Sequence, residues 1–156
     1  NVFAHGGMRL IIARGAILTI SVLIAYFAAF AFNGAYSFSA IKALSESDPN
    51  VLHQAQTMAF TTLAFGELFH MFAMRNTEKS SFSVFASGNV MMFAAFFVGI
   101  ALQFAVIEIP ALQMIFNTAN LSGYEWLITA ICSLLPLLWQ EIIAAVKAVK
   151  RRKRNA

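Results

Sequence analysis

The sequence has 156 residues, of which 60% are hydrophobic and 12% are charged, and its net charge is +4. This composition excludes an ordinary soluble globular domain and indicates an integral membrane protein. One cysteine, Cys132, excludes an intrachain disulfide and a cysteine metal cluster, and its apolar surroundings predict a small buried hydrophobic residue.

Four apolar segments are long enough to cross a bilayer, because a helix needs about 20 residues to span the hydrocarbon core. We therefore predict an all-α membrane bundle of four transmembrane helices. The predicted spans cover about residues 10–32, 56–74, 89–109 and 126–146. The connection before the second span is polar and has room for a short surface helix at Ser39–Leu44, whereas the connection before the fourth span is expected to be a loop.

Several residues in these spans carry structural expectations. Arg14, near the start of the first span, is expected to extend its charge toward water. Gly15 either lets a neighbouring helix approach closely or is simply tolerated there. Tyr124 and Trp126 are expected to form an aromatic anchor at the membrane interface, and Pro136 is expected to kink the fourth span because it lacks a backbone donor.

The Lys and Arg residues are distributed unequally between the two sides of the membrane. The side with both chain ends receives Arg9, Arg14, Arg75, Lys79 and the six charges of 147–154, whereas the other side receives only Lys42. The positive-inside rule therefore predicts that both termini and the loop 75–88 are cytoplasmic. Because the basic tail directly follows an apolar helix, it is expected to contact anionic lipid and not nucleic acid.

The second segment places Glu67 near its middle and His70 one turn later. A charge at that depth costs at least about 2.5 kcal/mol, so an ionisable residue there is a candidate functional group. The i, i+3 spacing puts both side chains on one helix face. The same side carries Gln56, Phe60, Leu63 and Met74.

A carboxylate at membrane depth becomes neutral either by protonation or by binding a cation. Glu67 therefore suits a cation transporter, and the alternative is a protonated carboxyl that hydrogen-bonds a neighbouring helix. For His70 the structural interpretation is the stronger one, because a single histidine does not make a metal site. Calcium takes six to eight oxygens, and Glu108 and Glu141 lie near the ends of their spans, so most ligands must come from elsewhere.

The sequence contains no glycine-rich phosphate loop, no Ser-His-Asp set and no His-Glu-x-x-His motif. Nothing in the chain itself indicates an enzyme or a bound cofactor. The sequence opens at Asn1 without a methionine, and we expect it to be a piece of a longer protein.

The second segment, QTMAFTTLAFGELFHMF followed by RNTEKS, resembles the eighth transmembrane helix and the next loop of P-type cation-transporting ATPases of the calcium-pump type. The start of the family's seventh helix is similar to Phe3–Gly15, the end of its ninth to Val106–Phe116, and its tenth to Tyr124–Lys147. In this last segment Gln140 stands where the family has an acid. The resemblance covers essentially the whole chain and corresponds to helices seven to ten.

The resemblance implies a role for Glu67, which falls where the eighth helix of calcium pumps supplies one carboxylate to the membrane calcium site. His70 falls where sodium pumps place an aspartate of an additional sodium site. Sodium pumps also carry acids in the ninth helix, where this chain has Phe97 and Val98. Their absence here favours calcium as the transported cation.

The resemblance also implies a parent pump that uses ATP and Mg²⁺ in phosphorylation, nucleotide and actuator domains that this sequence does not contain. Helices one to six of that pump would supply the other cation ligands, in a bilayer that we expect to be a bacterial plasma membrane. Two alternatives remain open. One is a self-contained four-span carrier that works as an oligomer through Glu67, and the other is a non-catalytic accessory subunit.

Overall fold

The computed structural model describes residues 7–75 and 90–155. In these two ranges the chain forms six helices and no strand, which confirms the predicted all-α class. The helices are α1 (Gly7–Phe32), α2 (Phe38–Ser47), α3 (Pro49–Arg75), α5 (Val90–Glu108), α6 (Pro110–Phe116) and α7 (Gly123–Asn155).

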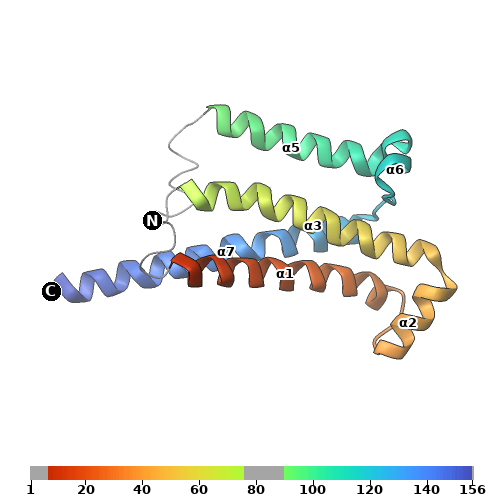
Figure 1. The fold of residues 1–156 in the computed structure, drawn as a ribbon, viewed down its shortest axis with the longest axis horizontal. Coiled ribbons are helices and arrows are strands. Elements are labelled where there is room, and N and C mark those ends of the chain that lie inside the picture. Colours follow the sequence, from red (N-terminus) through yellow and green to blue (C-terminus); the bar gives the residue numbers. More distant parts are fainter. Residues whose placement is uncertain (1–6, 76–89, 156) are drawn as a thin grey trace.

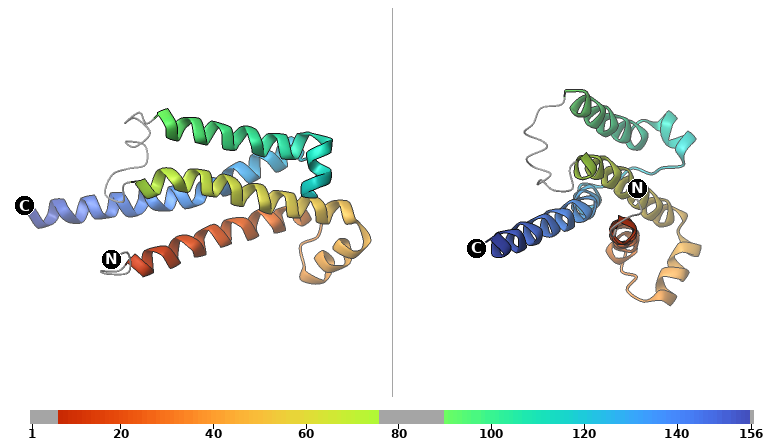
Figure 2. Two further views of the ribbon diagram at one scale, coloured as in Figure 1. Left: turned by 45° about the horizontal axis from the view of Figure 1, so that its top comes forward. Right: turned by 60° about the vertical axis from the view of Figure 1, so that its left-hand side comes forward.

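The four long helices run alongside one another, and the short helices α2 and α6 both lie at one end of the bundle (Figure 1). At the opposite end α1 begins and α3 and α7 end. Helices α1, α3 and α7 pack against each other, whereas α5 packs on α3 and α6 (Figure 2). Helix α3 is therefore the central element, because it contacts α1, α2, α5 and α7.

The helix boundaries follow local capping rules. The short helix expected near Ser39–Leu44 is present as α2, where the Ser37 hydroxyl accepts a hydrogen bond from the Ala40 amide at 3.2 Å. Helix α3 begins at Pro49, before the predicted span start at residue 56, because proline suits the first helical position and Asp48 Oδ1 accepts from the Asn50 amide at 2.9 Å.

The stretch after α5 is not the loop that the sequence predicts. It contains α6, which begins with Pro110 and ends at Phe116, followed by the capping residue Asn117 in the left-handed conformation, with φ 53°. Proline favours the first turn of a helix, and asparagine tolerates the left-handed conformation that ends it. Helix α7 in turn continues beyond the predicted fourth span to Asn155, with Pro136 inside it.

Small side chains fill the contact between α1, α3 and α7. Ala25, Ala29 and Ala55 are completely buried, and Cys132 is buried as predicted. Small residues let helix backbones approach closely, which is the main source of packing energy inside a membrane. The glycine that serves this contact is Gly66, where an added Cβ would lie 2.6 Å from Leu18 Cδ1.

At Gly15 no described helix makes such a close approach. An added Cβ at Gly15 would meet nothing within 4 Å among the described residues. Trp126 stacks on Phe104 with the ring centroids 4.5 Å apart and so joins α7 to α5, while its role as an interface anchor stays a prediction. Tyr124, the other predicted anchor, is 77% exposed.

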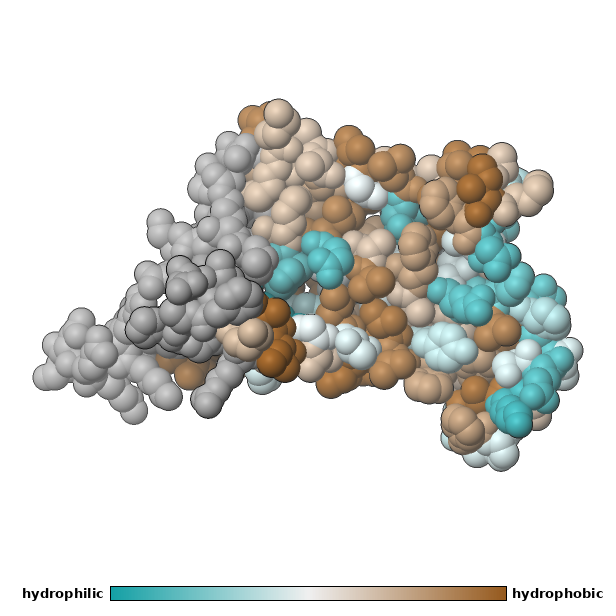
Figure 3. Space-filling model, viewed as in Figure 1, coloured by the Kyte–Doolittle hydropathy of each residue, from teal (hydrophilic) through white to brown (hydrophobic). Residues whose placement is uncertain are grey.

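Three described helical segments are long and apolar enough to cross a membrane: Ile11–Phe32, Val90–Glu108 and Gly123–Ile143. Helix α3 has 27 residues but is not among them. Its packed side carries polar residues, since Thr57, Thr61 and Thr62 are almost fully buried. Apolar residues cover most of the visible middle of the bundle, and hydrophilic residues gather near α2 (Figure 3). The count of four spans stays a prediction.

Candidate functional site

Helix α3 has one face that no other described helix covers. Gln56, Phe60, Leu63 and Glu67 are exposed there, at spacings of three and four residues. We call these four residues the open face of α3. They are the residues that the sequence placed on one side with Glu67, apart from Met74, whose side chain lies outside the described residues.

The other sides of α3 are packed. Ala55, Met58 and Phe65 are buried among the residues facing α1 and α7, and Thr61 accepts a hydrogen bond from Gln103 of α5 at 3.0 Å. Glu67 therefore occupies the side of the central helix that no helix of the described residues covers.

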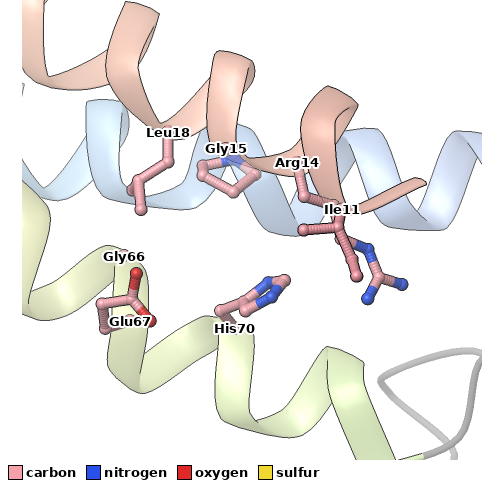
Figure 4. Close-up of a pocket in the computed structure, with 8 residues that line it drawn as sticks. Ile11, Arg14, Gly15, Leu18, Gly66, Glu67 and His70 are labelled. Carbon is pink, nitrogen blue, oxygen red and sulfur yellow. The ribbon is translucent and has the colours of Figure 1, made fainter. Parts of the chain in front are cut away.

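Glu67 and His70 border a cavity of about 240 Å³ between α1 and α3, closed at the back by α7. The cavity is lined by Ile11, Arg14, Gly15, Leu18, Gly66, Glu67, His70 and Pro136. In Figure 4 the His70 ring lies between the Glu67 carboxylate and the cationic end of Arg14. The structure thus brings the two predicted site residues together and adds a guanidinium to them.

The expectation that Arg14 extends toward water is wrong. Its side chain is 9% exposed, and Nη2 donates to Gln140 Oε1 of α7 at 2.6 Å, in a contact that joins residues 126 positions apart. A buried charged group needs hydrogen-bond acceptors, and Gln140 provides one inside the bundle. Sequence reasoning missed this pairing because an isolated arginine near a helix end gives no sign of its partner.

A second polar pair connects α5 to α3. Gln103 is 6% exposed and its Nε2 donates to Thr61 Oγ1. An amide in an otherwise apolar run is the signal that could have identified it, because polar groups in a membrane helix face other helices.

In residues 7–75 and 90–155 the acidic and histidine side chains do not complete a metal site. Among the residues that the structure describes, no group of three or more His, Cys, Asp and Glu side chains comes together. Glu108 is the last residue of α5 and is exposed, and Glu141 lies within α7. Since calcium takes six to eight oxygens, any calcium held by Glu67 needs further ligands from outside this set.

Comparison with known proteins identifies the family. The family model described as "Cation transporting ATPase, C-terminus" matches residues 1–146. The chain belongs to this family of cation-transporting ATPase C-terminal regions. The resemblance drawn from the sequence is thereby confirmed.

Relatives of this cation-transporting ATPase region include whole transport proteins. The chain is 31% identical over 142 residues to calcium-transporting ATPase 1 of Bacillus cereus, covering 91% of this chain and 16% of that protein. It is 29% identical over 136 residues to a calcium-transporting ATPase of Bacillus subtilis, a match that covers 87% of this chain and 14% of that protein. It is 32% identical over 98 residues to calcium-transporting ATPase type 2C member 2 of Mus musculus, a match that covers 58% of this chain and 10% of that protein. The chain therefore spans about a sixth of the first relative's length.

Proposed function

We propose that this chain is the C-terminal membrane part of an ATP-driven P-type pump that transports calcium. Its membrane domain comprises four spans at about 10–32, 56–74, 89–109 and 126–146, with both termini in the cytoplasm. The calcium-transporting ATPases among its relatives support the substrate. The basic residues on one side of the bundle support the orientation. The Bacillus relatives support a bacterial plasma membrane.

The observation that carries the proposal is the exposed position of Glu67 on the open face of α3. A membrane helix that is packed on its other sides by α1, α5 and α7 offers this face to further helices. Helices one to six of the pump cover it and contribute the other calcium ligands. Glu67 then supplies one carboxylate to the cation in one state and carries a proton in the other, because either form avoids an uncompensated charge in the membrane.

The remaining parts of the chain support that carboxylate. Helices α1 and α7 fix α3 through small buried residues, and the Arg14–Gln140 hydrogen bond ties α1 to α7 beside the cavity. His70 lies next to Glu67 and is the weaker candidate for a cation ligand, since it is half-buried against α1. ATP and Mg²⁺ act in the phosphorylation and nucleotide domains of the pump, to which this chain contributes no residues.

The test uses the full-length pump in membrane vesicles, with ATP-driven calcium uptake and the calcium dependence of ATP hydrolysis as readouts. Glu67→Gln keeps the shape but removes the charge, and we expect the apparent calcium affinity to fall at least about tenfold, equal to about 1.4 kcal/mol. Leu63→Ala is the matched control, because it lies one turn away on the same open face and should leave the affinity unchanged. Calcium uptake that is unaffected by Glu67→Ala would refute the proposal.

The size of the native polypeptide separates the pump from the two alternatives. An antibody against residues 147–156 should detect a membrane protein several times larger than the 17.1 kDa of this chain. A band at 17.1 kDa would instead favour a self-contained carrier or an accessory subunit. These two differ in the effect of Glu67→Gln, which alters ion transport in the carrier and only stability in the subunit.

A further inference from the structure

The end of the bundle that carries α2 and α6 exposes large apolar and aromatic side chains. Tyr36 and Phe38 at the start of α2 are 83% and 80% exposed, and Met114 and Ile115 in α6 are 84% and 73% exposed. Singly exposed apolar residues are common on proteins, but a cluster on a short helix marks an interaction surface.

In and after α6 the usual arrangement of polar and apolar groups is reversed. The amide of Gln113 donates to the Ile107 carbonyl and to Asn120 Oδ1, and the Thr118 hydroxyl donates to the Val106 carbonyl at 2.7 Å. The Gln113 and Thr118 side chains thus turn toward the protein, while Met114, Ile115 and Phe116 are exposed beside Asn117 and Asn120. A segment facing water places its polar groups outside, so this segment is built for an apolar environment.

The backbone after α6 is also tied to the bundle. The Ala119 amide donates to Thr57 Oγ1 of α3 at 2.8 Å, and the Thr118 amide donates to the Gln113 carbonyl at 3.1 Å. In lipid an unsatisfied backbone group costs several kcal/mol, so a segment that enters the membrane must pair these groups within the protein. The contacts of residues 113–120 follow this requirement.

Helix α2 combines two environments along its length. Ala40, Ile41 and Leu44 pack on the core. Phe38, the first residue of α2, and Tyr36, two residues before it, are exposed. Lys42 and Glu46 are exposed further along α2. Tyr side chains concentrate where the membrane meets water, an apolar Phe favours the acyl chains beside it, and charged side chains remain in water.

We propose that α6 and the N-terminal end of α2 bind the interface between lipid headgroups and acyl chains, on opposite sides of the bundle (Figures 1 and 2). Lipid is the occupant because α6 follows the apolar helix α5 after a single residue, Ile109, so its apolar surface continues that of a candidate membrane span. Helix α6 contains no charged residue and lies deeper than α2, whose charges hold it near water. The two helices fix the depth and tilt of the bundle. This surface is independent of the cation site.

The test places a nitroxide label at single cysteines in the full-length pump, reconstituted in phosphatidylcholine vesicles after other reactive cysteines are replaced. Cys132 can stay, because it is buried. The test positions are Met114→Cys on α6 and Phe38→Cys on α2. Phe97→Cys on α5, at 63% exposure, is the lipid control, and Glu46→Cys on α2 is the water control. Spin relaxation by oxygen reports lipid exposure, and relaxation by a soluble nickel chelate reports water exposure.

We expect the oxygen-to-nickel ratio at residue 114 to approach that at residue 97 and to exceed that at residue 46 several-fold, with residue 38 between them. A ratio at residue 114 equal to that at residue 46 would overturn the proposal, because the helix would then face water. Low accessibility to both reagents would also overturn it, because protein would cover the helix. The same labels in a Glu67→Gln pump should give unchanged ratios, which separates this surface from the cation site.

Discussion

Helices α3 and α5 lie side by side but face different surroundings. Helix α5 is almost entirely apolar, and its buried residues are Phe96, Gln103 and Ile107. Helix α3 is the central helix and buries three threonines, yet it is the long helix that fails the apolar criterion for a span. Apolar composition therefore identifies α1, α5 and α7 as candidate spans, and it misses the central helix that carries the candidate carboxylate.

The same difference should govern stability. In a membrane the hydrophobic effect does not bring helices together, so close packing and hydrogen bonds between helices decide their association. Helix α3 joins α1 and α7 along much of its length, whereas α5 meets it mainly through Gln103, Gly99 and aromatic contacts. Changes between α1, α3 and α7 should therefore cost more than changes at α5. The readout is the thermal unfolding midpoint of the full-length pump in detergent.

The largest loss is expected for Gln140→Leu. It removes the acceptor 2.6 Å from Arg14 Nη2 in a buried contact between α1 and α7. A hydrogen bond to a charged group contributes about 1.5–3 kcal/mol, so the midpoint should fall clearly. Leu138→Ala on the exposed side of the same helix is the control and should change little. Equal midpoints for the two variants would show that Gln140 does not support Arg14.

Substitutions of two glycines should differ in their effect, and Gly15→Ala should give the higher thermal midpoint. Gly66→Ala places a Cβ 2.6 Å from Leu18 Cδ1, the end of a flexible side chain, so Leu18 must change its conformation at the α1–α3 contact, which costs about 0.5–1.5 kcal/mol. Gly15→Ala meets nothing within 4 Å among the described residues and should stabilise α1 by up to about 1 kcal/mol. Equal thermal midpoints for the two variants would contradict the assignment of Gly66 as the close-contact glycine.

Gln103→Leu tests the edge of the bundle. It removes the hydrogen bond to Thr61 that joins α5 to α3. Hydrogen bonds between membrane helices contribute about 0.6–1.7 kcal/mol, so the loss should be smaller than for Gln140→Leu. Leu102→Ala, on the exposed side of α5, is the control. A loss larger than that of Gln140→Leu would reverse the proposed order of the two regions.

The smallest effect is expected at the helix caps. Ser122 and Glu125 form a reciprocal cap at the start of α7, in which the Ser122 amide donates to Glu125 Oε2 at 2.6 Å. Ser122→Ala should cost about 0.5–1 kcal/mol. Ser37→Ala removes the cap of α2, which has no buried residue, and should lower the midpoint less. The opposite order would mean that α2 contributes more to the fold than its packing indicates.

The candidate site was predictable where it depends on helical periodicity. Glu67 and His70 share a side because residues three and four apart are neighbours on any α-helix. The partner of Arg14 was not predictable, since Gln140 comes from a helix at the other end of the sequence. From its residue type and its place at the start of a span, Trp126 was predicted to be an interface anchor. Its stacking on Phe104, which joins α7 to α5, could not be read from the sequence.

The amino-acid sequence by itself determined the helical class, the family and the residues that line one side of α3, because composition and helical spacing are local properties of the chain. Only the tertiary structure decided that this side is left open, that Arg14 turns inward and that Gly66 makes the close contact instead of Gly15. These outcomes depend on which helices lie next to each other. Distant segments settle that arrangement together, through packing and hydrogen bonds that no single stretch of sequence contains.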